Sequence, residues 1–220
     1  MLERLLPAGA VVHEARGDLE GTLFAVEQAI VARAVEKRRR EFTSGRLCAR
    51  AALTRLGVEP GAIPAGPRGA PQWPPGVVGS ITHCEGFRAC AVARASRLAA
   101  VGVDAELDAP LPPGLLADIA LPVERERLAR LATEEPRISW DRLLFSAKES
   151  VYKAWFPLAG RWLGFEDAEL TIDRRLRSFS ARLLVPGPQL GSGELTGFEG
   201  AWLVGNGLIL TAIALSATHR

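Results

Sequence analysis

Two acidic side chains stand close together in a segment that could bind a metal ion. Residues 98–106 have the composition of a strand, in which alternate side chains share a face, so Gly102, Asp104 and Glu106 lie side by side. Neighbouring carboxylates repel each other, and a bound cation removes that cost. We therefore expect a cation between Asp104 and Glu106, and room for a ligand beside Gly102. A strand that merely ends in a polar turn is the alternative.

A third carboxylate, Glu149, belongs to a segment with the period of one long helix, residues 139–156. Ser139 is the expected N-cap, and Pro157 is expected to end the helix. Glu149 and Lys153 lie one turn apart, opposite the apolar stripe. The same face carries three aromatic residues, Phe145, Tyr152 and Phe156. A helix face exposed to solvent would not need three aromatic residues, so we expect other parts of the protein to cover this face. The alternative is a surface Glu–Lys pair that only supports the helix.

Basic side chains that could bind an anion lie mainly in the first half of the chain. Residues 22–56 are predicted to be helical with one possible break, and Arg46 and Arg50 share a face there. His83 follows an apolar run and is expected at a strand end, in a turn rich in hydrogen-bond donors. A turn histidine without a role is the alternative. The cations that could answer a phosphate are Arg38, Arg39, Arg46, Arg50, Arg68, Lys148 and Lys153.

These residue types together indicate metal-assisted chemistry on a phosphate-bearing substrate. Carboxylate oxygens suit Mg²⁺, which usually keeps waters and takes phosphate oxygens as further ligands. Attack on a pyrophosphate needs positioning and neutralisation of charge, which a metal and fixed cations supply. The sequence contains no P-loop, GxGxxG or kinase signature, and this excludes the common nucleotide-binding modules.

Four blocks of the sequence resemble the 4′-phosphopantetheinyl transferases. Residues 101–106 (VGVDAE) match the family's G-[IV]-D-x-E strand, and residues 145–153 (FSAKESVYK) match its [FW]-[SC]-x-K-E-[SA]-x-x-K helix. Residues 38–50 and 69–83 are similar to the Sfp or enterobactin-synthetase-component-D branch, in the arrangement of the actinobacterial enzymes of the mycobacterial type.

The resemblance implies an enzyme that moves the 4′-phosphopantetheine arm of coenzyme A to a serine of an apo acyl or peptidyl carrier protein, releasing adenosine 3′,5′-bisphosphate. The carrier would serve siderophore, polyketide or nonribosomal peptide synthesis. Asp104, Glu106 and Glu149 would bind Mg²⁺ or Mn²⁺. Glu149, as base, and Lys153 would be catalytic. The implied coenzyme A ligands are Arg38, Arg46, Arg50, Arg68, Thr82, His83, Lys148 and Lys153. Ala65 stands where several relatives have lysine, so Arg68 is expected to supply that charge.

The predicted elements favour an α+β fold of two similar lobes with antiparallel sheets. A breaker-rich loop is expected at residues 57–76 and a hairpin turn at Asn206-Gly207. Further strands are expected at 77–84, 87–93, 163–165 paired with 168–172, 179–184, 201–204 and 208–213, and a helix at 123–131. The resemblance adds a pseudo-two-fold relation, with the active site between an N-terminal lobe, 1–100, and a C-terminal lobe, 101–220.

Composition limits the class of protein. The 220 residues are 48% hydrophobic and 24% charged with net charge +2, which is enough for a core and unlike a disordered or globally basic chain. Three cysteines without a CxxC pattern, and no long apolar run, favour a cytoplasmic monomer without membrane or nucleic-acid partners. A coenzyme A-binding protein without turnover, or a nucleic-acid binder using residues 38–50, is the alternative.

Overall fold

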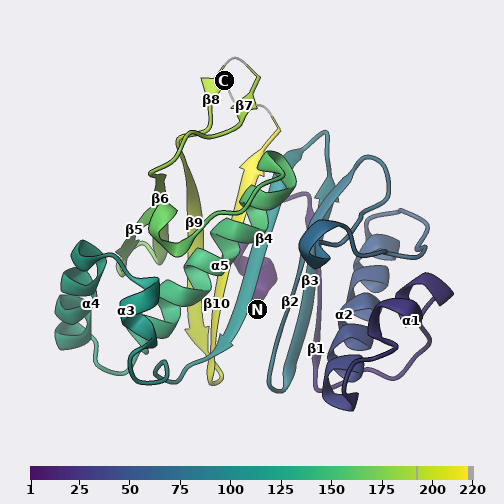
Figure 1. Cartoon of the computed structure of the whole chain (residues 1–220), viewed down its shortest axis with the longest axis horizontal. Coiled ribbons are helices and arrows are strands. Elements are labelled where there is room, and N and C mark those ends of the chain that lie inside the picture. The colour runs from purple at the N-terminus through teal and green to yellow at the C-terminus, as the bar shows by residue number, and fades with distance from the viewer. Residues whose placement is uncertain (192, 218–220) are drawn as a thin grey trace.

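Two antiparallel sheets, one from each half of the chain, form the body of the protein (Figure 1). The computed structural model describes residues 1–191 and 193–217. The first sheet has the order β1 (Ala10–Arg16), β3 (Phe87–Arg94), β2 (Val77–Cys84). The second has the order β4 (Leu98–Leu107), β10 (Leu208–Ser216), β9 (Gly197–Gly205), β6 (Ser178–Leu183), β5 (Ala168–Asp173). The predicted α+β class with antiparallel sheets is therefore correct.

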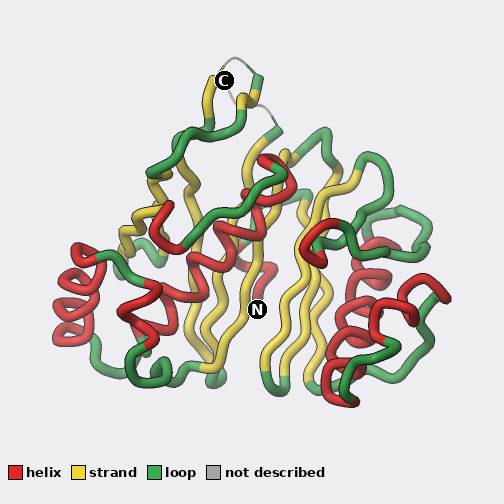
Figure 2. The backbone as a smooth tube through the Cα atoms, viewed as in Figure 1, coloured by secondary structure: helices red, strands yellow, loops and turns green. Residues whose placement is uncertain are grey.

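Helices lie outside the strands, which occupy the middle of the molecule (Figure 2). In the first half, the short helix η1 (Leu2–Leu5) precedes β1, and α1 (Ala25–Val31) and α2 (Glu36–Arg55) follow it. The predicted helical stretch is thus broken once, at residues 32–35. The small residues Cys48, Ala49 and Ala52 of α2 are buried with Cys90 and Val92 of β3, so the helix lies close to its sheet.

The second half repeats the order of strand, long helix and hairpin. Its helices are α3 (Leu115–Ile119), α4 (Pro122–Glu134), α5 (Trp140–Ala159) and η3 (Phe165–Asp167). The strand order β4-β10-β9 corresponds to β1-β3-β2 in the first half, and β6 and β5 extend the sheet. A small extra pair, β7 (Gln189–Leu190) and β8 (Gly193–Glu194), lies apart. Asn206 and Gly207 both have positive φ, 53° and 73°, which confirms the predicted hairpin turn.

Several predicted boundaries are wrong for local reasons. Pro157 does not end α5, because a proline near the end of a helix sacrifices a single backbone bond; Gly160 in the left-handed region ends it. Ser139 is the N-cap residue of α5, as predicted, although its side chain makes no capping bond. Residues 163–165 form no strand with β5, which pairs with β6 instead. His83 lies within β2, opposite Arg88, and the turn begins after Cys84.

Gly102 serves helix packing and does not leave room for a ligand. A Cβ atom at this position would overlap the carbonyl oxygen of Ser150 and lie 2.8 Å from the amide nitrogen of Ala154, both in α5. The backbone of α5 therefore occupies the space beside β4 that we had assigned to a ligand. The expectation was wrong because the helix that packs on this face of β4, α5, is distant from it in the sequence.

Side chains join the two sheets where β2 and β4 lie side by side. Ser80 and Thr82 of β2 accept hydrogen bonds from the amides of Val103 (3.1 Å) and Ala105 (2.9 Å) of β4. Thr82 also donates to Asp104 Oδ1 at 3.2 Å. One buried cluster contains residues of both sheets, so the halves share a core.

The long loop of residues 57–76, which the sequence predicted, is docked onto the body through its tryptophan. It contains the single turn η2 (Pro67–Gly69), and Trp73 Nε1 donates to the carbonyl of Gly79 at 3.0 Å. The three cysteines are free, with Cys48 and Cys90 buried. In the described part of the chain, every helix is too short or too polar to cross a membrane.

Candidate active site

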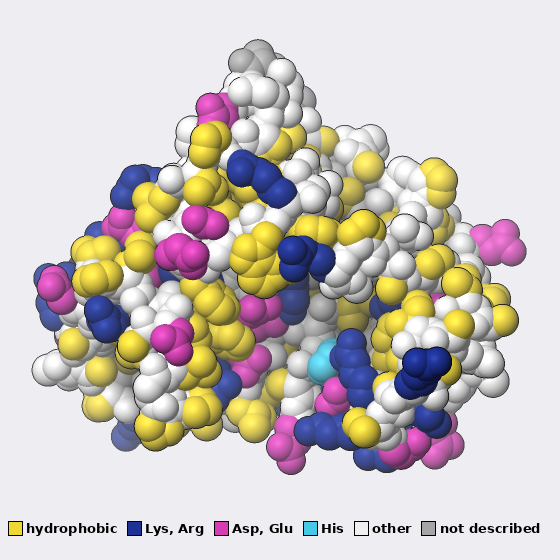
Figure 3. All heavy atoms as spheres, in the orientation of Figure 1, with side chains coloured by type: hydrophobic (Ala, Val, Ile, Leu, Met, Phe, Trp, Pro, Cys, Tyr) yellow, Lys and Arg dark blue, Asp and Glu magenta, His cyan; other side chains and the backbone are white. Residues whose placement is uncertain are grey.

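A cavity of about 250 Å³ lies between the two halves. Figure 3 shows the molecule hollowed there, with acidic and basic side chains gathered around the opening. The first half contributes Arg38, Glu41, Phe42, Arg46, Arg68, Trp73, Ser80, Ile81 and His83, among others. From α5 come Glu149, Tyr152, Lys153, Phe156 and Pro157. Charged groups of both signs together with aromatic rings suit an anionic organic ligand.

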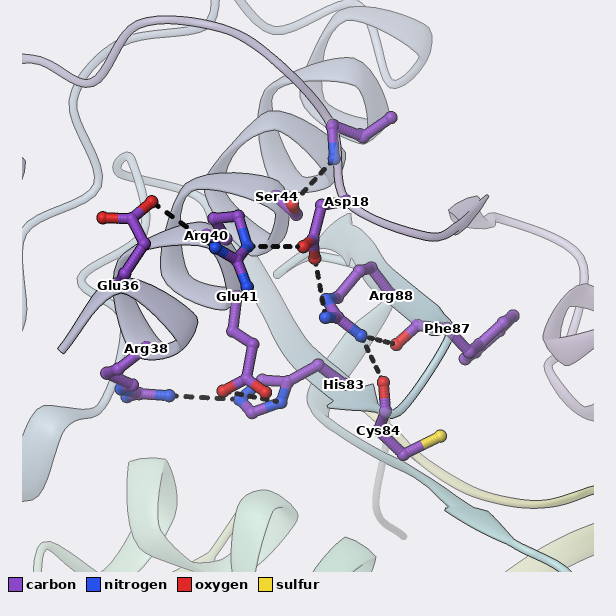
Figure 4. Close-up of polar contacts among 11 residues, drawn as sticks. Asp18, Glu36, Arg38, Arg40, Glu41, Ser44, His83, Cys84, Phe87 and Arg88 are labelled. Atoms are coloured by element: carbon purple, nitrogen blue, oxygen red, sulfur yellow. Dashed lines mark hydrogen bonds and ion pairs between the residues drawn. The ribbon is translucent and has the colours of Figure 1, made fainter.

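His83 and Arg38 form a preset pair on the wall made by β2 and α2 (Figure 4). Arg38 Nη1 lies 3.1 Å from His83 Nε2, and Glu41 Oε2 lies 3.9 Å from Nδ1. Burial lowers the pKa of His83, and Glu41 opposes this while Arg38 adds to it. A guanidinium can only donate, so Nε2 accepts and the proton of the neutral ring is assigned to Nδ1, toward Glu41.

Arg46 is a buried cation held in place before any ligand arrives. Its side chain is 5% exposed, its Nε donates to the carbonyl of Ile63 at 2.9 Å, and its guanidinium lies 4.3 Å from the centre of the Phe42 ring. Burial lowers the pKa of Arg46 to about 10, and Glu27 raises it in opposition. Arg46 therefore keeps its charge at neutral pH.

Glu149 and Lys153 line the opposite side of the cavity, and the carboxylates of Asp104 and Glu106 lie behind them, outside the lining. Lys153 Nζ donates to Asp104 Oδ1 at 2.6 Å and to the carbonyl of Val103 at 3.2 Å. Glu106 pairs with Arg142 at 3.0 Å. Burial raises the pKa of Glu149, with Lys153 opposing and Asp104 reinforcing the shift. Burial, and then Asp104, raise the pKa of Glu106. The carboxylates repel one another, as the sequence indicated.

The acidic residues fit a cation without forming a closed cage. Among the described residues, no cluster of three or more histidine, cysteine, aspartate or glutamate side chains is already arranged to hold a metal. Asp104 is nevertheless 4% exposed, and its Oδ2 is buried without a hydrogen-bond partner. An unpaired buried carboxylate oxygen beside two carboxylates of raised pKa is the environment that a hard divalent cation stabilises.

Arg68 and two aromatic residues connect the halves at the edge of the cavity. Arg68 adopts a positive φ of 55° and places its guanidinium 5.1 Å from the ring centre of Trp162. Trp162 in turn lies 4.8 Å from the ring of Tyr152. The loop of residues 57–76 thus contacts the segment that follows α5.

Three predicted coenzyme A ligands lie outside the lining of this cavity. Arg50 Nη1 contacts both oxygens of Glu27. Lys148, 4% exposed, pairs with Glu124 at 2.9 Å and also donates to two backbone carbonyls. Thr82 is used in the contact between β2 and β4. The structure brings Arg38, Arg46, Arg68, His83, Glu149 and Lys153 together around the cavity.

Other lining residues escaped the sequence analysis as members of the site. Glu41 faces His83, and its position one turn after Arg38 on α2 was the available signal. Phe42 and Trp73 line the cavity as well. Tyr152 and Phe156 confirm that the second face of α5 is covered, and their rings lie 5.7 Å apart.

An α+β fold with cations and carboxylates around one cavity suits a protein that binds a phosphate-bearing substrate. Comparison with known proteins gives the same class. Residues 26–93 match the 4′-phosphopantetheinyl transferase N-terminal domain, and residues 100–190 match the 4′-phosphopantetheinyl transferase superfamily.

Whole proteins match as well. The chain is 57% identical to the 4′-phosphopantetheinyl transferase Svp of Streptomyces mobaraensis, over 99% of this chain and 90% of that protein. It is 49% identical to Npt of Nocardia iowensis, over 97% and 99%, and 48% identical to PptT of Mycobacterium tuberculosis, over 86% and 84%. The chain belongs to the 4′-phosphopantetheinyl transferase superfamily, as an enzyme of the Sfp type.

Proposed function

We propose that this enzyme transfers the 4′-phosphopantetheine arm of coenzyme A to a serine of apo acyl or peptidyl carrier proteins, and that the cavity between its halves is the active site. The observation that carries the proposal is the cavity itself, where Arg38, Arg46 and His83 of one half face Glu149 and Lys153 of the other. We infer lobes of residues 1–100 and 101–220 related by a pseudo-two-fold. The repeated order of strand, helix and hairpin supports this division.

The basic residues of the first lobe bind the phosphates of coenzyme A. Arg38, Arg46, Arg68 and His83 line one side of the cavity, where charge-assisted hydrogen bonds to phosphate oxygens are strong. Arg50, Lys148 and Thr82 are not part of this proposal, because their polar groups are engaged elsewhere.

The acidic residues of the second lobe hold the metal and handle the proton. Asp104, Glu106 and Glu149 would bind Mg²⁺, or Mn²⁺ in its place, which neutralises charge on the pyrophosphate when bound. Glu149 accepts the proton of the serine hydroxyl, and its raised pKa makes it a better base than an ordinary carboxylate.

The bonds change at the phosphorus next to pantetheine. The serine oxygen forms a bond to this phosphorus while the pyrophosphate bond breaks, and the bonding electrons leave with the phosphate of adenosine 3′,5′-bisphosphate. Lys153 stabilises that departing charge. The serine proton goes to Glu149, so atoms and charges balance.

The basic-helix alternative is weakened by the pairing of the arginines on α2. Arg39 donates to two carbonyls of α1 and the following turn, Arg40 contacts Asp18 and Glu36, and Arg50 contacts Glu27. The charges of Arg40 and Arg50 are thus matched by carboxylates, and the donors of Arg39 are used within the protein, which leaves less for a nucleic-acid backbone. We infer a cytoplasmic monomer that works on carrier proteins of siderophore, polyketide or nonribosomal peptide synthesis.

The deciding experiment incubates the protein with coenzyme A, Mg²⁺ and an apo carrier protein, and then measures the mass of the carrier. We expect the carrier to gain one phosphopantetheine and adenosine 3′,5′-bisphosphate to accumulate, both suppressed by EDTA. An unchanged carrier with coenzyme A bound, measured by calorimetry, would favour the binding-protein alternative. Absence of both transfer and binding would overturn the assignment of the cavity.

A further inference from the structure

Glu27 is a fully buried carboxylate that lies behind the cavity wall. Its side chain is 0% exposed, and Arg50 Nη1 donates to both of its oxygens, at 3.0 and 2.9 Å. The amide of Phe24 donates to Oε2 and that of Ile63 to Oε1, each at 2.9 Å. Arg46 Nε lies 4.0 Å from Oε1. One carboxylate thus joins α1, α2 and the loop of residues 57–76.

The contacts of Glu27 form a closed ring with a residue that lines the cavity. Ile63 donates its amide to Glu27, and its carbonyl accepts from Nε of Arg46 at 2.9 Å. Arg46 lines the cavity, and the loop that contains Ile63 continues to Arg68 and Trp73, which line it too. Glu27 therefore restrains both a cation and the loop without touching the cavity itself.

The second lobe contains a similar buried carboxylate, Glu124, away from the cavity. It accepts from the amides of Leu121 and Leu170, each at 2.7 Å, and from Lys148 at 2.9 Å. Each of the two carboxylates accepts hydrogen bonds from the backbone amide at the start of its own helix and from an amide distant in the sequence. Each also pairs with a cation of the neighbouring long helix. Only the set around Glu27 includes a cavity residue, Arg46, so Glu124 provides a matched control.

We propose that Glu27 is a positioning residue for coenzyme A. It acts on Arg46, directly and through the backbone of Ile63, and holds that guanidinium in the orientation that the bound nucleotide requires. This inference rests on the proposed function of the cavity. Groups ordered before binding lose less freedom when the ligand arrives, so Glu27 contributes to affinity for the nucleotide. The proton transfer and bond cleavage involve other residues, so the rate at saturating coenzyme A is insensitive to it.

Glu27→Gln tests this, because glutamine keeps the shape and removes the charge. In the folded variant we expect the Kd for coenzyme A, and that for adenosine 3′,5′-bisphosphate, to rise at least about tenfold in calorimetry. The turnover number at saturating coenzyme A stays within about twofold of wild type. Glu124→Gln loses a comparable buried charge and leaves both Kd values unchanged.

A double-mutant cycle separates positioning from general loosening of the lobe. Arg46→Ala removes the group through which Glu27 acts, so adding Glu27→Gln to it should weaken binding by less than about twofold more. Full additivity, or an unchanged Kd in folded Glu27→Gln, would overturn the inference. If Glu27→Gln does not fold, Glu27→Asp decides, because it keeps the charge and shortens the reach: a Kd raised at least about threefold supports positioning, and a wild-type Kd overturns it.

Measurements on the wild-type protein distinguish a failure of this inference from a failure of the proposed function. If wild type binds coenzyme A and modifies the carrier while folded Glu27→Gln does so with the same Kd, positioning alone fails. If wild type neither binds nor transfers, the assignment of the cavity fails first, and the role of Glu27 fails with it.

Discussion

The individual arginine and lysine side chains of this protein differ in whether a nearby carboxylate already neutralises their charge. Arg50 and Lys148 are paired with the buried carboxylates Glu27 and Glu124. Arg46 instead uses its Nε on a neutral carbonyl, and Arg38 contacts a neutral histidine. Arg38 and Arg46 therefore keep more of their field for a bound anion than Arg50 and Lys148 do, and they line the cavity. Lys153 also lines it but is paired with Asp104 at 2.6 Å.

The role of Glu149 is tested by Glu149→Gln. Glutamine keeps the shape but can neither accept the serine proton nor bind Mg²⁺ as a carboxylate, so turnover should fall at least ~10²-fold. Coenzyme A should still bind, because the cations remain. Mass measurement of the carrier and calorimetry check the two outcomes, with Glu126→Gln on the exposed face of α4 as a control. Retention of more than about a tenth of wild-type turnover would contradict the assignment, since that is a loss of only ~1.4 kcal/mol.

The partly buried His83 predicts a pH dependence of stability. Burial lowers its pKa in the folded protein below the ordinary value of 6.5, so the unfolded chain binds the proton more readily. The stability due to neutral His83 is therefore present above about pH 6.5 and is lost as the pH falls toward the folded pKa.

We expect His83→Gln to lose less stability than wild type when the apo protein is moved from about pH 7.5 to about pH 5.5 in urea denaturation. The raised pKa values of Glu106 and Glu149 act in the opposite direction. They do so in both proteins, so the difference isolates the histidine. An equal or larger loss in His83→Gln would show that His83 is not held neutral by the fold.

Among the elements, α5 determines the geometry of the acidic side of the site. Its backbone lies against β4 at Gly102, and it is fastened to β10 by Ser146 and Thr211, whose hydroxyl oxygens are 3.0 Å apart. This close packing sets how far Lys153 and Glu149 reach toward the residues of β4. The distance between these side chains of α5 and the carboxylates of β4 is thus set by a helix–sheet contact.

Gly102→Ala should push α5 away from β4. The added methyl group would overlap the Ser150 carbonyl, so we expect a loss of stability on the order of 1–3 kcal/mol and a lower turnover number. Gly61→Ala is the control, because a Cβ there has no neighbour within 4 Å and the residue has no left-handed φ. Chemical denaturation gives the comparison, and equal stabilities of the two variants would refute the packing argument.

At the scale of the whole molecule, the two halves share a core and line one cavity. Residues such as Phe87 of the first sheet and Leu210 of the second belong to one buried cluster. Side chains of Ser80 and Thr82 add bonds across the same boundary. The lobes should therefore not unfold independently.

Calorimetry of the apo protein should show a single unfolding transition. Coenzyme A at about 100 times its Kd should raise the free energy of unfolding by ~2.7 kcal/mol, since it binds only the folded protein. Arg46→Ala should reduce the shift at the same ligand concentration. Two resolved transitions, with coenzyme A moving only one of them, would argue against a shared core and a site between the lobes.

The sequence alone determined the local elements, whose conformation depends on residues that are neighbours in the chain. The helical period around Glu149, the alternation around Asp104 and the turn at Asn206-Gly207 follow from local backbone geometry, so these elements could be predicted. The family motifs placed Arg46, His83 and Lys153 in one site because such motifs record which residues meet in the folded enzyme. The structure indeed brings these three around one cavity.

Only the tertiary structure showed which groups pair with the buried charges and where two backbone segments approach each other closely. Arg50 looked equivalent to Arg46, yet the two point to different groups, because Glu27 approaches α2 from a separate helix. Gly102 was predicted to leave space for a ligand, but the backbone of α5 occupies that space. Glu27 itself carried no signal in the sequence, since one of its hydrogen bonds comes from an amide 36 residues away. Such contacts arise when distant elements pack, and no local pattern of residue types encodes them.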